Sequence, residues 1–88
     1  MTRTEVFDKV TKIIAPFAPR NFQGALTEST HITDNLGVNS ARFVDIVLEL
    51  EDQFGISIDD SKMGKMKTVG DVVNEVMSLI PVEAAPGD

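Results

Sequence analysis

The order of apolar and polar residues along the chain predicts three long helices. In three stretches the apolar residues recur every three or four positions, so that each helix would carry them on one face. Each stretch begins beside a residue that can cap a helix and ends at a proline or a glycine. The predicted helices span residues 3–15, 40–54 and 69–79.

The first and last of these helices have clear start and stop signals. Thr2 and Glu5 have the spacing of a capping box, in which each side chain bonds the backbone N–H of the other residue. Thr68 can cap the last helix in the same way, as the residue immediately before its first turn. Pro16 and Pro81 then prevent regular continuation of the first and last helix.

The central helix combines a broad apolar face with an unusual polar face. We expect it to begin at Ser40, a residue type that most often serves only as an N-cap there, and to end at Gly55. Leu48 falls on the polar side, between Asp45 and Asp52, which indicates a docking surface or an ordinary exposed leucine. The apolar face consists of Phe43, Val44, Ile46, Val47, Leu50 and Phe54.

The remaining segments predict one short helix and a long loop. Residues 59–61 can cap a short helix that runs through Met66, after an extended link that buries Ile56 and Ile58. The loop over 16–33 needs apolar residues to hold it against the domain, and four are suitable. They are Phe17, Phe22, Leu26 and Ile32.

These elements together predict the fold class and the domain. We expect an all-α fold, a small four-helix bundle with three longer helices, one short helix and a long loop between helices one and two. The domain would span residues 1–80, and residues 81–88 would form a disordered tail.

Composition narrows the classes of partner. The 88 residues are 42% apolar and carry a net charge of −6, with five phenylalanines as the only aromatic residues. The core should therefore be aliphatic, and the acidic charge opposes binding to nucleic acid or to an anionic membrane while favouring partners with basic patches. With no apolar run long enough to span a membrane, we expect a cytoplasmic monomer without membrane insertion.

No catalytic residue and no metal site are predicted. The segment that begins at Asp59 resembles a calcium loop only at Gly64, and its later positions cannot coordinate calcium. His31 is the only histidine, with no second ligand arranged near it, so it is interpreted as a surface polar residue. There are no cysteines, which excludes disulfides, thiolate metal sites and thiol catalysis by the chain itself. We therefore do not expect an enzyme.

Three runs of residues, in one register from Ile32 to Val69, resemble the acyl carrier proteins. They are Leu36-Gly37-Val38-Asn39-Ser40, Val44-Asp45-Ile46-Val47 and Leu50-Glu51-Asp52-Gln53-Phe54-Gly55-Ile56-Ser57-Ile58. The resemblance implies that a phosphopantetheinyl transferase attaches 4′-phosphopantetheine, taken from coenzyme A, to Ser40 through a phosphodiester. It also implies that the arm holds acyl groups as thioesters and delivers them to fatty-acid, lipid-modifying or polyketide-type enzymes. Such a protein without cysteine obtains its thiol from the arm.

Three positions beside Ser40 differ from the family pattern. Asn39 replaces an aspartate, Ala41 replaces a leucine, and Arg42 stands where many members have an acid. These differences bear on which transferase and which acyl-transferring enzymes recognise the chain. The predicted partner-docking residues are Asn39, Ala41, Arg42, Asp45, Leu48, Glu49 and Asp52.

The charge pattern predicts a carrier dedicated to one pathway. Residues 41–54 hold four acids and one base, a net of −3, whereas residues 60–75 hold three acids and three lysines, a net of zero. A partner that needs continuous acidic charge along both segments would bind poorly. Two alternatives remain open at this point: a non-carrying helical adaptor that docks through its central helix, and a peptidyl or aminoacyl carrier.

Overall fold

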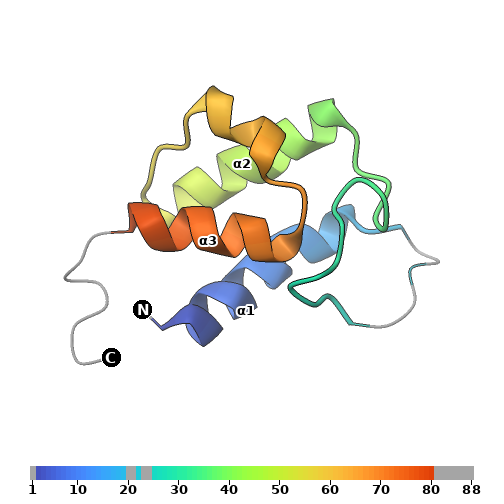
Figure 1. The fold of residues 1–88 in the computed structure, drawn as a ribbon, viewed down its shortest axis with the longest axis horizontal. Helices are drawn as coiled ribbons and strands as arrows, with labels where there is room; N and C mark the ends of the chain where they lie inside the picture. The colour runs from blue at the N-terminus through green and yellow to red at the C-terminus, as the bar shows by residue number, and fades with distance from the viewer. Residues whose placement is uncertain (1, 20–21, 23–24, 81–88) are drawn as a thin grey trace.

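The protein is a small helical bundle. The computed structural model describes residues 2–19, 22 and 25–80, and within them there are three α-helices, two short 3-10 helices and no β-strand. In chain order the elements are α1 (Arg3–Ile14), η1 (Ala15–Phe17), α2 (Ser40–Phe54), η2 (Asp60–Lys65) and α3 (Val69–Leu79) (Figure 1). The predicted all-α fold is confirmed, and the predicted tail over 81–88 lies outside the described residues.

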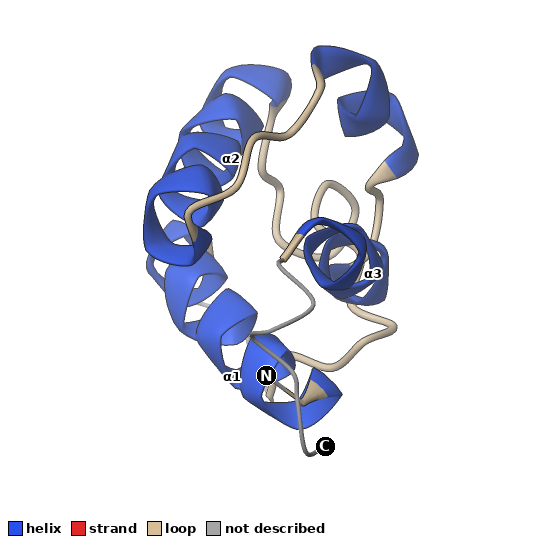
Figure 2. Cartoon of the chain, turned by 90° about the vertical axis from the view of Figure 1, so that its left-hand side faces the viewer, coloured by secondary structure: helices blue, strands red, loops and turns tan. Residues whose placement is uncertain are grey.

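Helices α1 and α2 form one layer, and α3 packs against it. Helix α1 contacts both α3 and α2, and Figure 2 shows α3 nearly end-on beside the other two helices. The three helices meet through aliphatic side chains, and no phenylalanine is among the fully buried residues. The most deeply buried are Val6, Val10, Ile14, Ile32, Ile46, Leu50, Val47, Val69, Val72, Val73 and Val76. Burying each of these side chains stabilises the fold by about 1.5–3 kcal/mol.

Both predicted capping patterns are present. The N–H of Glu5 donates to Thr2 Oγ1 at 3.2 Å, and the N–H of Thr2 donates to Glu5 Oε1 at 2.8 Å. At α3 the N–H of Asp71 donates to Thr68 Oγ1, and the N–H of Thr68 donates to the Asp71 carboxylate, both at 3.1 Å. Burial raises the pKa of Asp71, but these bonds and one from the Lys67 N–H outweigh it, so its pKa lies below the ordinary value.

Three expectations about the packing were wrong in detail. Val44 was assigned to the buried face of α2, but its side chain is 41% exposed. It lines an open pocket between α2 and the segment around η2, so no side chain covers it fully. The short helix is a 3-10 helix that ends at Lys65, one residue before Met66. Of the two isoleucines in the extended link, Ile58 is buried whereas Ile56 is only partly buried.

The loop before α2 is held against the start of α3 by backbone hydrogen bonds. The N–H of Ile32 donates to Lys67 O at 2.9 Å, and the N–H of Gly70 donates to Glu28 O at 2.9 Å. Arg3 adds a link from α1, since its Nη2 lies 2.6 Å from Glu28 Oε1, and this hydrogen bond lowers the pKa of Glu28. Ile32 is buried as expected, and Phe17, Phe22 and Leu26 pack partly buried against the core.

A side chain at Gly70 would disturb this contact. An added Cβ would lie 3.0 Å from Glu28 O and 3.2 Å from Glu28 Cβ, whereas a Cβ at Gly64 would meet no atom within 4 Å. We expect Gly70→Ala to lower the free energy of unfolding by about 1 kcal/mol, because crowding outweighs the better helix propensity of alanine. Gly64→Ala is the matched control and should cause no loss. Urea denaturation measures both, and equal stabilities would contradict the expectation.

Candidate functional site

The start of α2 presents Ser40 on the surface. Ser40 was expected to begin the helix, and it does, but the N-cap is Asn39. Asn39 has an extended backbone, and its side-chain Oδ1 accepts the N–H of Arg42 at 2.9 Å. The interpretation of Ser40 as the N-cap is therefore wrong, because the amide of the preceding residue already occupies that role. Ser40 is the first residue inside the helix, and it is exposed.

The turn before Ser40 is tightly held. Leu36 and Val38 are each only 3% exposed and anchor it in the core. Gly37 lies between them with φ of 68°, in the left-handed region that glycine enters without strain. The N–H of His31 donates to Asn35 Oδ1 at 2.6 Å, which closes the other end of the turn. Ser40 is thus displayed from a well-anchored segment.

A pocket of about 710 Å³ opens beside Ser40. Its wall combines the turn, the first part of α2 and the segment around η2, which lie far apart in the sequence. The lining residues are His31, Thr33, Asp34, Val38, Asn39, Ser40, Phe43, Val44, Met63, Gly64, Met66 and Lys67. Sequence analysis did not connect Met63, Lys67 or His31 with Ser40, and no local pattern in the chain joins them.

His31 is less exposed than a typical surface residue. Its backbone pairs with Thr68 in an isolated bridge, and its Nδ1 lies 3.5 Å from Asp34 Oδ2. The Nδ1 atom itself is buried and, among the described residues, has no hydrogen-bond partner. His31 therefore lies at the edge of the Ser40 pocket and joins the loop to the start of α3.

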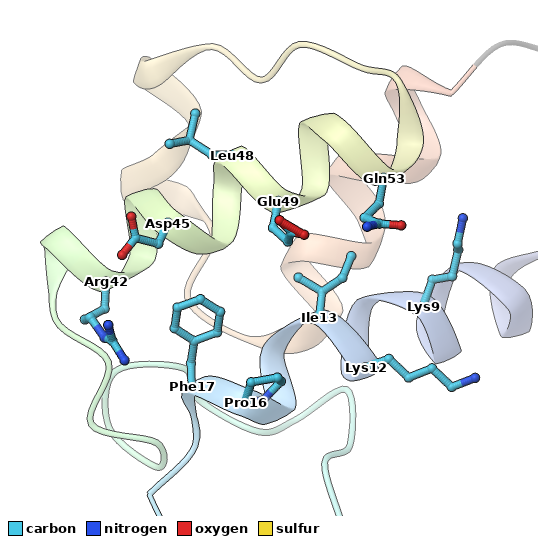
Figure 3. A pocket seen from close by; sticks show the side chains of 10 residues that line it. All are labelled: Lys9, Lys12, Ile13, Pro16, Phe17, Arg42, Asp45, Leu48, Glu49 and Gln53. Carbon is cyan, nitrogen blue, oxygen red and sulfur yellow. The ribbon is translucent and has the colours of Figure 1, made fainter.

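The residues predicted to dock partners are all exposed, but they do not form one flat surface. Asn39 and Ala41 flank Ser40, and Leu48 is 57% exposed in the middle of α2. Arg42 points toward η1, with its guanidinium 5.2 Å from the centre of the Phe17 ring (Figure 3). Asp45, Glu49 and Asp52 complete the set on the exposed side of α2.

Comparison with known proteins decides the family. A family profile described as a phosphopantetheine attachment site matches residues 8–76. The chain belongs to the acyl carrier protein family. It is 36% identical over 75 residues to the acyl carrier protein of Thermotoga maritima, covering 85% of this chain and 91% of that protein. It is 37% identical over 81 residues to the acyl carrier protein of Lactobacillus acidophilus, covering 89% and 96%.

The fold agrees with a solved acyl carrier protein. A structure titled as the acyl carrier protein from Enterococcus faecalis superposes with a TM-score of 0.70 at 40% identity, covering 89% of this chain and 98% of that chain. Among the described residues of the present carrier, no helix is both long and apolar enough to cross a membrane. The resemblance to the family that the sequence suggested is therefore confirmed.

Membership of the family establishes the kind of work this carrier does. It carries acyl intermediates, it is not an enzyme, and its prosthetic group is covalently attached 4′-phosphopantetheine. Its partners are a phosphopantetheinyl transferase and acyl-handling enzymes. When attached, the group supplies a terminal thiol that holds acyl groups as thioesters. The exposed start of α2 and the adjoining pocket fit such a group, and the chain has no cysteine of its own.

Proposed function

We propose that Ser40 is the residue that carries 4′-phosphopantetheine. The observation that carries this proposal is the division of roles at the start of α2: Asn39 caps the helix, so the exposed Ser40 is not needed as its cap. The N-terminus of a helix also has partial positive charge, which favours an attached phosphodiester anion by about 0.3–1 kcal/mol. The pocket beside Ser40 gives the attached arm room on the protein surface.

Loading with coenzyme A tests the attachment directly. The apo protein is incubated with coenzyme A and a broad-specificity phosphopantetheinyl transferase, and intact mass is measured. We expect the mass to rise by one arm, and peptide mapping should find the added group on Ser40. A chain that stays bare, or an arm on another residue, would defeat the proposal.

The exposed side of α2 is proposed as the surface that partner enzymes meet first. Three carboxylates there, those of Asp45, Glu49 and Asp52, can attract basic patches, and Leu48 can add a small apolar contact. Asn39, Ala41 and Arg42 lie next to Ser40 and would affect how a bound partner is positioned. We propose the same surface for the transferase, and we propose that the monomeric protein works in the cytoplasm.

We further propose that the carrier serves a dedicated pathway. The acidic charge of α2 does not continue into η2, where Lys62 and Lys65 are exposed. The Glu51 carboxylate lies toward the link after α2, where it accepts the Ile58 N–H at 2.7 Å. Acyl-loading rates with housekeeping fatty-acid enzymes and with enzymes of a dedicated synthase should differ in favour of the latter. Equal rates with both sets would contradict this assignment.

A further inference from the structure

A groove of about 820 Å³ runs between α1 and α2 (Figure 3). We call it the α1–α2 groove. Its apolar floor is formed by Ile13 of α1 and by Pro16 and Phe17 of η1, and Leu48 lines its outer edge on α2. It shares no lining residue with the pocket beside Ser40, so α2 separates the two hollows. A ligand in the groove would leave the Ser40 pocket open.

The two rims of the α1–α2 groove carry opposite charge. Lys9 and Lys12 line it from α1, whereas Asp45 and Glu49 line it from α2, where Arg42 is the one basic residue of that rim. Figure 3 shows the two lysines on α1, the two carboxylates on α2 and the side chains of Ile13, Pro16 and Phe17 between them, with Leu48 on the far side of the carboxylates. A ligand for this surface needs an apolar centre, negative charge along one edge and positive charge along the other.

Two cation–aromatic contacts link α2 to α1 and η1 across the groove. The Arg42 guanidinium lies 5.2 Å from the centre of the Phe17 ring, and Lys9 Nζ lies 5.2 Å from the centre of the Phe54 ring. Arg42 is the residue that interrupts the acidic run of α2. Because it contacts Phe17, Arg42 is part of the groove wall as well as a basic residue on an acidic helix. The groove is present in the structure of the chain alone.

We propose that the α1–α2 groove docks an amphipathic helix of a partner enzyme. Its apolar stripe would lie on Ile13, Pro16 and Phe17, its acidic side chains along the two lysines, and its basic side chains along Asp45 and Glu49. An amphipathic helix has polar residues on both sides of an apolar stripe, which matches this arrangement. An acyl chain fits less well, because it would leave the charged residues of both rims without partners. An extended strand also fits less well, because its successive side chains point to two opposite faces.

The groove proposal rests on the proposed function, because it takes the partner to be an enzyme that acts on the arm of this carrier. Binding in the groove does not itself require a loaded arm, because Ser40 lines the other hollow. An enzyme bound in the groove could stay bound while the arm on Ser40 enters its active site. The α2 residues proposed for first encounter thus work together with α1 in the bound complex.

A synthetic helical peptide tests the groove on the full-length, phosphopantetheine-loaded chain. The peptide carries a leucine stripe with glutamates along one flank and lysines along the other. NMR shift mapping should place it on Ile13 and Phe17. Titration of Lys9→Glu/Lys12→Glu should show affinity about tenfold lower, since two attractive pairs become repulsive. Adding Asp45→Lys/Glu49→Lys exchanges the rims, so the peptide should bind in reverse direction with its affinity restored.

Two controls separate the groove from charge in general. Lys62→Glu/Lys65→Glu makes the same change of charge on η2, away from the groove, and should leave the affinity unchanged. A peptide with glutamates on both flanks should bind the unaltered protein about tenfold more weakly, which tests the acidic rim without any change in the chain. Equal binding of the two peptides, failure of the four-residue exchange to restore affinity, or shifts centred on the Ser40 pocket would overturn the proposal.

Two further outcomes are decided by the same samples. Concentration-dependent dimerisation of the protein through Lys12 and Glu49, seen by sedimentation without peptide, would replace the partner helix by a second copy and overturn the proposal. Intact mass reports loading independently. A loaded chain without groove binding defeats the docking proposal alone, whereas groove binding by a chain that cannot be loaded defeats only the attachment proposal.

Discussion

Ser40→Ala is expected to remove loading completely while leaving the protein as stable as the unaltered chain. Alanine has no hydroxyl to form the phosphodiester, so no arm can be attached at this position. The helix keeps its cap, because Asn39 Oδ1 and not Ser40 accepts the free N–H of Arg42. Alanine is also a strong helix former in the first turn. Intact mass after incubation with coenzyme A and transferase measures loading, and urea denaturation measures stability.

Asn39→Ala should have the opposite effect. It removes the capping oxygen and should lower the free energy of unfolding by about 1 kcal/mol, while Ser40 still becomes loaded when the reaction runs to completion. Ser57→Ala, an exposed serine in the link after α2, should change neither property. Loading of the Ser40→Ala variant would refute the assignment. A loss of stability equal to that of Asn39→Ala would refute the division of roles between the two residues.

Leu50→Ala is expected to cost the largest amount of folding free energy among these variants. Leu50 is fully buried at 0% exposure where α2 faces the core. Removing its branched end loses transfer free energy and leaves a cavity, which together should lower the free energy of unfolding by about 2–5 kcal/mol. Small domains are stable by only about 5–15 kcal/mol, so the urea midpoint should fall far below that of the unaltered protein.

Leu48→Ala provides the matched comparison on the same helix. It makes the same chemical change two residues earlier, where the side chain is 57% exposed. The free energy of unfolding should change by less than about 0.5 kcal/mol. If the two variants were equally destabilised, the orientation of α2 described above would be wrong.

Much of the fold was predictable because its signals are local. The apolar period, the Thr2–Glu5 capping box and Pro16 defined α1 to within one residue, and Thr68 marked the start of α3. The exposure of Leu48 followed from its place on a helical wheel. Each of these depends on residues within one or two turns of each other, where backbone geometry alone determines which side chains share a face.

The start of α2 was less predictable because two adjacent residues can perform the same role. Asn39 and Ser40 are both good caps, and only the backbone conformation decides which one lies outside the helix. Val44 was misplaced for a related reason. A helix with so broad an apolar face has positions at the edge of that face, and the neighbouring segment decides whether such a position is buried or exposed.

The sequence by itself determined the three long helices to within one residue at each end, the aliphatic core, the family pattern and Ser40 as the candidate attachment residue. Only the tertiary structure brought His31, Met63 and Lys67 to the pocket beside Ser40, and only it paired the lysines of α1 with the carboxylates of α2 across a groove. The reason is physical. Periodicity describes one helix at a time, whereas pockets and grooves depend on how helices are rotated and placed against one another, and packing of the whole core decides that.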